Sequence, residues 1–174
     1  MDLNQLADHI YGVIEDKGFH GIQHSQVETL TFRQLLHLVT EWGEMFYHYD
    51  TMRIADHRTG QEHLARLYEE GADVLIVALD LAAMHRLDLG DVPLEKPYLG
   101  AIVDLYTSVP LAIGLLGDIY RKHRYLDKEK LVIVIRTVCE LMRRHGADPL
   151  EQVQIKMRKN AGRPARYGTA EVAG

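Results

Sequence analysis

The sequence predicts an all-α fold, and two observations support this prediction. Leu and Ala are plentiful whereas Phe is scarce, a composition that favours helices over sheets. Apolar residues also recur at helical spacing along most of the chain, and no segment has the pattern of a β-strand. At 174 residues, we expect residues 1–174 to form a single domain with a substantial core.

Helical spacing marks six segments in order: residues 2–17, 26–49, 61–85, 98–123, 127–145 and 149–160. Polar loops are expected at 18–25 and 50–60, and Pro110 is expected to kink or split the fourth helix. Asp148 precedes a proline in the manner of an N-cap residue, so the last helix starts there. The tail at 162–174, rich in Gly and Ala, is expected to be partly disordered.

Composition narrows the classes of function. A net charge of −5 argues against binding to polymeric nucleic acid, although small phosphorylated ligands stay open. The longest apolar stretch, residues 101–117, contains Asp104 and Pro110 and is short for a membrane span. No signal peptide is apparent, and the single Cys139 excludes an internal disulfide framework. We therefore expect a cytoplasmic protein without membrane contact.

Two short acidic motifs are the most informative feature of the chain. Glu41-Trp-Gly-Glu44 and Glu70-Gly-Ala-Asp73 each place two carboxylates on one helix face, since their spacing is i, i+3. Both motifs adjoin apolar runs and contain no Lys or Arg, so local ion pairs do not explain them. If the two helices pack antiparallel, four carboxylates meet, and a hard cation such as Mg²⁺ or Mn²⁺ suits oxygen ligands. The alternative is a pair of solvated helix faces.

Further polar residues extend these faces. His37 and His48 continue the stripe of the first motif, either as partners of the metal ligands or as partly exposed histidines. Asp80 lies two turns beyond the second motif, either as a reserve ligand or as a solvated residue.

A basic cluster lies near the C-terminus. Lys156, Asn160 and Arg163 fall at i, i+4 and i+7 on one helix face. Lys and Arg suit phosphate, and Asn suits a sugar hydroxyl or a carboxylate. The alternative is that the cations only complement the end of a helix.

Taken together, the ExxE helix, the ExxD helix with its following apolar run, and the late Lys-x-x-x-Asn-x-x-Arg helix resemble the all-α nucleoside triphosphate pyrophosphohydrolases. This group includes MazG-like enzymes and dimeric dUTPases. The resemblance covers about residues 26–88 and 151–168 and implies a four-helix-bundle core of MazG-like type, with residues 98–145 as additional helices.

The resemblance implies Mg²⁺-dependent cleavage of a nucleoside triphosphate into monophosphate and pyrophosphate, with Mn²⁺ as a substitute ion. The four acids at 41, 44, 70 and 73 would hold the metal, and Glu41 or Glu44 would orient or deprotonate the water. Lys156, Asn160 and Arg163 would contact the substrate, whose base stays open.

The resemblance also implies a homodimer or homotetramer, and the apolar residues of the stretch from 98 to 116 point the same way. The rival is a monomer in which residues 98–145 are a degenerate repeat that replaces the partner. Two other functions stay open: a non-catalytic helical nucleotide-binding or interaction module, and a carboxylate-bridged di-iron bundle, which prefers Glu-x-x-His motifs.

Overall fold

The structure is a computed structural model that describes residues 2–17, 27–92, 94 and 102–162, and within these ranges it contains only α-helices as regular structure. They are α1 (Leu3–Asp16), α2 (Val27–Ile54), α3 (His57–Met84), α4 (Ile102–His123), α5 (Lys128–Arg144) and α6 (Pro149–Ala161). The all-α prediction is confirmed. The loop predicted at 18–25 and the tail predicted beyond Gly162 lie outside the described residues.

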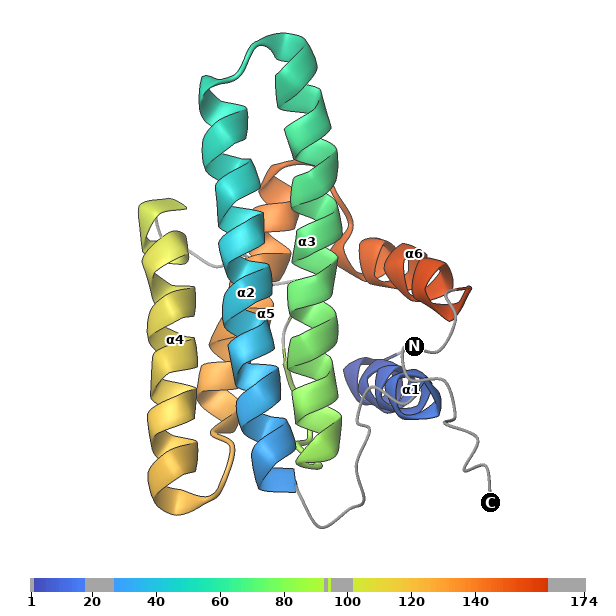
Figure 1. The fold of residues 1–174 in the computed structure, drawn as a ribbon, viewed down its shortest axis with the longest axis vertical. Helices are drawn as coiled ribbons and strands as arrows, with labels where there is room; N and C mark the ends of the chain where they lie inside the picture. The colour runs from blue at the N-terminus through green and yellow to red at the C-terminus, as the bar shows by residue number, and fades with distance from the viewer. Residues whose placement is uncertain (1, 18–26, 93, 95–101, 163–174) are drawn as a thin grey trace, which may run out of the picture.

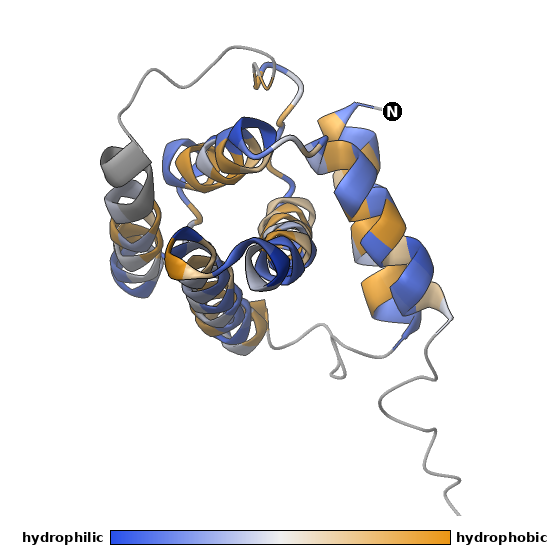
Figure 2. Ribbon diagram, turned by 90° about the horizontal axis from the view of Figure 1, so that it is seen from above, coloured by the Kyte–Doolittle hydropathy of each residue, from blue (hydrophilic) through white to orange (hydrophobic). Residues whose placement is uncertain are grey.

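The long hairpin of α2 and α3 is the centre of the molecule (Figure 1). Helix α4 packs against α2 and α5, and α5 packs against α3, whereas α1 and α6 both pack on α3. Viewed along the long helices, Figure 2 shows them arranged around a common interior, with α1 lying obliquely beside them.

One hydrophobic cluster includes buried residues from all six helices. The segment from 98 to 145, expected as an addition to the core, contributes to this cluster through α4 and α5. Within the part of the chain that the structure describes, the helices are too short or too polar to cross a bilayer.

The predicted loop at 50–60 is wrong, because α2 continues to Ile54 and α3 begins at His57. The Asp56 carboxylate accepts a hydrogen bond of 3.0 Å from the Thr59 amide and caps α3. At the end of α2, the Thr51 hydroxyl donates to the Tyr47 carbonyl at 2.8 Å. The polar residues taken as a loop are therefore mostly the ends of two long helices joined by a tight turn.

Helix α4 continues through Pro110, so the alternative of a split helix is excluded. Proline removes only one backbone donor, and Pro110 itself is exposed. Val109, Ile113 and Leu116 on the same helix are buried in the core. Their burial favours a continuous helix over a break.

Two of the later helix starts are secured by aspartate caps. Asp148 accepts from the amides of Leu150 at 2.9 Å and Glu151 at 3.1 Å, which confirms the predicted start of α6. Asp127 accepts from the amide of Lys130 at 3.1 Å and starts α5.

Gly71, inside the second acidic motif, lets α3 approach two neighbours closely. A β-carbon at this position would lie 2.9 Å from the Met142 sulfur of α5 and 3.2 Å from the terminal carbon of Met45 on α2. Real β-carbons do not approach other atoms as closely as the shorter of these distances. A side chain at this position would therefore have to displace the ends of these two methionine side chains.

Candidate metal and nucleotide site

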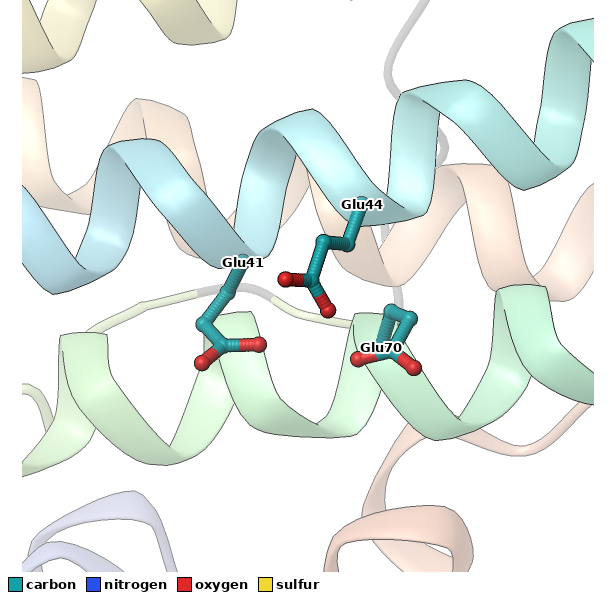
Figure 3. Close-up of side chains that lie close together, drawn as sticks. All are labelled: Glu41, Glu44 and Glu70. Atoms are coloured by element: carbon teal, nitrogen blue, oxygen red, sulfur yellow. The ribbon is translucent and has the colours of Figure 1, made fainter.

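The two acidic motifs face each other across the α2–α3 hairpin, as the sequence predicts. Glu41 and Glu44 project from α2 toward Glu70 of α3, and one carboxylate oxygen from each lies within 4.8 Å of the others (Figure 3). Glu41 and Glu70 are partly buried, whereas Glu44 is exposed. We refer to these three residues as the three-glutamate cluster.

Asp73, the fourth predicted ligand, lies beside this cluster and has a cationic partner. Its carboxylate accepts a hydrogen bond from the Lys156 ammonium group of α6. The charge of Glu41 acts on Asp73, so the two carboxylates are near each other. Asp73 therefore connects the acidic motifs to the basic helix.

Sequence reasoning missed Glu69, which belongs to the same network. Its carboxylate lies 3.3 Å from the Lys156 ammonium group and also accepts from Lys159. The signal was present in the sequence, because Glu69 and Asp73 are four residues apart and share a helix face. Lys156 is nearly buried, so this pairing with two carboxylates compensates the loss of its hydration.

The acids of the network differ in pKa. Burial, and then the negative charges of Asp73, Glu44 and Glu41, raise the pKa of Glu70 to about 7, although Lys156 opposes the shift. Burial also raises the pKa of Asp73 against the hydrogen bond from Lys156. A cation bound beside Glu70 and Asp73 would stabilise the ionised form of both carboxylates.

Glu69 shows the opposite behaviour, since the hydrogen bond from Lys159, together with Lys156, lowers its pKa to about 2. Its charge is thus compensated by lysines. Among the described residues, the ion-pair partner of the three-glutamate cluster is instead a histidine, His37 at Glu41. The two halves of the network therefore differ in how their negative charge is compensated.

His37 is joined to the cluster through Glu41. Its Nε2 lies 2.7 Å from a Glu41 oxygen, and this hydrogen bond is the main reason that the pKa of His37 is raised. The two alternatives for His37, a partner of a metal ligand or a partly exposed histidine, therefore both describe it. Its side chain is half exposed and contacts Glu41, a predicted ligand. His37 can hold the Glu41 carboxylate in a fixed orientation.

A pocket of about 350 Å³ opens beside these residues, between α1, α2, α3 and α6. Glu41, His37 and Asp73 line one part of it. Six apolar side chains form most of the remaining wall, namely Val13, Ile14, Leu30, Ile76, Val77 and Met157. The polar side chains of Lys17, Arg33, Gln34 and Asn160 complete it. The volume falls in the range of small-molecule sites, which combine apolar walls with a few polar groups.

Of the predicted substrate-binding residues, Asn160 lines this pocket, whereas Lys156 lies deeper at Asp73. The Asn160 Oδ1 atom is buried and has no hydrogen-bond partner among the described residues. A ligand that supplies a donor would satisfy it. Arg163 lies outside the described residues. Lys17 donates to the Ala161 carbonyl at 2.8 Å and links α1 to the end of α6.

Two other expectations are resolved by the geometry. Asp80 is fully buried and accepts a hydrogen bond from the Gln34 side chain, which excludes the alternative of a solvated residue. It does not join the three-glutamate cluster within the described residues. His48 pairs with His63 of α3 and likewise lies outside that cluster.

The donor set fits a hard divalent cation. Three carboxylates converge in the three-glutamate cluster, and oxygen ligands suit Mg²⁺ or Mn²⁺. A di-iron site would combine carboxylates with histidine nitrogens. Within the described part of the chain, the cluster contains no histidine.

Comparisons of the chain with models of known protein families, with curated proteins and with solved structures find no match.

Proposed function

We propose that the protein is a Mg²⁺-dependent nucleoside triphosphate pyrophosphohydrolase with a MazG-like four-helix-bundle core, cleaving its substrate to a monophosphate and pyrophosphate. The observation that carries the proposal is the position of the acids. Three carboxylates converge on one point, and Glu41 among them also lines an apolar pocket of nucleotide-compatible chemistry. A triphosphate bound through a metal and a base bound by apolar walls need these two features side by side.

Glu41, Glu44 and Glu70 would hold the ion, with Asp73 beside them. An ion held there would supply positive charge to balance the negative charge of the phosphate oxygens. Because His37 donates to Glu41, it fixes the rotamer of this carboxylate. One of Glu41 and Glu44 orients or deprotonates the attacking water, and the position of the largely buried Glu41 side chain beside the pocket supports Glu41.

The remaining residues bind and orient the substrate. The apolar walls accept the base, and Asn160 supplies a buried acceptor to the base or sugar. The hydrogen bond from Lys156 favours the ionised form of Asp73 against its burial, and the same ammonium group is proposed to contact the phosphates. Arg163 is proposed as a further phosphate ligand on the basis of its sequence spacing.

The proposal is tested by pyrophosphate release from a panel of nucleoside triphosphates, with and without Mg²⁺ or Mn²⁺. We expect activity that requires the ion and is nearly lost in Glu41→Gln. Glu62→Gln is the matched control, because it is the same substitution at an exposed acid of α3. Turnover of no triphosphate by the folded wild-type protein would instead favour a non-catalytic nucleotide-binding module.

We further propose that the protein is cytoplasmic and forms a homodimer or homotetramer. Exposed apolar side chains lie on α2 and α4, next to an apolar groove between the same helices. They are Leu36, Val39, Leu111 and Leu115. Light scattering at micromolar concentration separates an oligomer from a monomer in which residues 98–145 replace the partner.

A further inference from the structure

Two histidines outside the three-glutamate cluster face each other across the α2–α3 hairpin. His48 lies on α2 and His63 on α3, and their Nδ1 atoms are 2.8 Å apart. The ring centroids are separated by 5.1 Å with an angle of 41° between the ring planes. Both side chains are partly buried, and each is in the interior of a long helix. Two imidazole nitrogens are therefore held at one point by a rigid scaffold.

This arrangement has room for one proton between the two nitrogens. One imidazole donates through its Nδ1 hydrogen, and the other accepts with its lone pair. A metal ion can replace that proton, since each neutral ring then offers a lone pair. With metal–nitrogen bonds of about 2.0–2.1 Å and a tetrahedral angle, the nitrogens would be about 3.4 Å apart. The change from 2.8 Å is small enough for side-chain rotation.

The surroundings favour the neutral, metal-binding form. Burial, followed by the charges of His63 and Arg66, lowers the pKa of His48. The positive charge of Arg66 is itself compensated, because its guanidinium lies 2.9 Å from Glu69. Glu44 lies one helical turn before His48, and its negative charge favours a cation at the pair.

The two sites differ in ligand chemistry. Imidazole nitrogen is a good donor to Zn²⁺, Ni²⁺ and Cu²⁺, whereas carboxylate oxygen suits Mg²⁺ and Mn²⁺. We propose that His48 and His63 form a two-histidine site for a divalent transition metal ion such as Zn²⁺, separate from the three-glutamate cluster. Water completes the coordination. The site does not depend on the proposed hydrolase activity.

The test is a Zn²⁺ titration of the full chain, monitored through the NMR signals of the imidazole nitrogens. Millimolar Mg²⁺ is present throughout, so that it competes with Zn²⁺ for the carboxylates of the three-glutamate cluster. We expect one equivalent of Zn²⁺ to shift the Nδ1 signals of His48 and His63 together. Unchanged signals from both residues would overturn the site and leave the pair as a hydrogen bond between helices.

Variants supply a second readout. Calorimetric Zn²⁺ affinity should fall by about 100-fold or more in His48→Gln and in His63→Gln, because the second imidazole acts at high effective concentration. His9→Gln, at an exposed histidine of α1, is the matched control and should bind like the wild type. Wild-type affinity in a folded His63→Gln variant would contradict the proposal. The NMR titration uses the unaltered chain, so it decides the question even if a variant does not fold.

Discussion

Replacing Glu70 with Gln is expected to stabilise the metal-free protein at alkaline pH and to remove its stabilisation by Mg²⁺. The Glu70 carboxylate lies within 4.8 Å of those of Glu41 and Glu44. Burial and neighbouring negative charges raise its pKa to about 7, so its ionised form is unfavourable in the folded state. Gln has nearly the same shape and carries no charge.

The size of the effect follows from the geometry. Two unit negative charges 4.8 Å apart repel by about 1 kcal/mol in bulk water and by about 3.5 kcal/mol at an effective dielectric constant of about 20. Glu44 is exposed, so its repulsion is near the lower value, and Lys156 attracts the Glu70 charge. We therefore expect a net gain of about 1–3 kcal/mol in the free energy of unfolding, or about 2–12 °C in Tm.

The sign of the pH dependence follows from the raised pKa. Below the ordinary value of 4.5, both the folded and the unfolded protein carry the Glu70 proton. Between 4.5 and about 7, only the folded protein keeps it, so the contribution of this group to stability is lost as the pH rises through that window. The advantage of Glu70→Gln should therefore grow across this window and stay constant above it.

The assay is thermal unfolding followed by circular dichroism at about pH 5 and about pH 8.5, with and without Mg²⁺. Wild type should gain stability from Mg²⁺, whereas Glu70→Gln should not. Glu62→Gln, at an acid that is 70% exposed, should behave like the wild type in every condition. The reasoning is refuted if Glu70→Gln is no more stable than wild type at the higher pH, or if Mg²⁺ stabilises both proteins equally.

Three further predictions concern packing, charge and capping. Gly43→Ala, which has open space, should stabilise the fold by about 0.5–1 kcal/mol in urea unfolding. Gly71→Ala should stabilise it less, because its β-carbon would have to displace the ends of the Met142 and Met45 side chains; an equal or larger gain at Gly71 would contradict the packing described for α3. Lys156→Ala should lower kcat/KM by about 10-fold or more. Lys159→Ala should lower it less, because Lys159 pairs with Glu69 and not with Asp73. Equal effects of the two substitutions would assign Lys156 no special role. Asp56→Ala should cost about 0.5–2 kcal/mol through the lost cap of α3, measured by urea unfolding, and an unchanged midpoint would show that the cap is dispensable.

The three-glutamate cluster could be predicted from the sequence because it depends on local spacing. Residues three apart on a helix share a face, and a short connection between two helices favours antiparallel packing. These two facts bring Glu41, Glu44 and Glu70 together. The helix ends were harder, since Asp56 had to be read as a cap within a polar stretch.

Contacts between distant segments could not be predicted in the same way. The pairing of Asp73 with Lys156 depends on how α6 packs against α3, and the two residues are 83 positions apart. The two alternatives for Asp80 also stayed open, because its hydrogen-bond partner, Gln34, lies on another helix 46 positions away. The partner of His48 could be found only once the register of α2 against α3 was known.

The most direct test of the proposed function is the identity of the products. A nucleoside triphosphate is incubated with the wild-type protein and Mg²⁺, and the products are identified by ³¹P NMR. The account predicts equal amounts of nucleoside monophosphate and pyrophosphate, and neither product with Glu41→Gln. Nucleoside diphosphate and inorganic phosphate as the products, or equal turnover by Glu41→Gln, would contradict it.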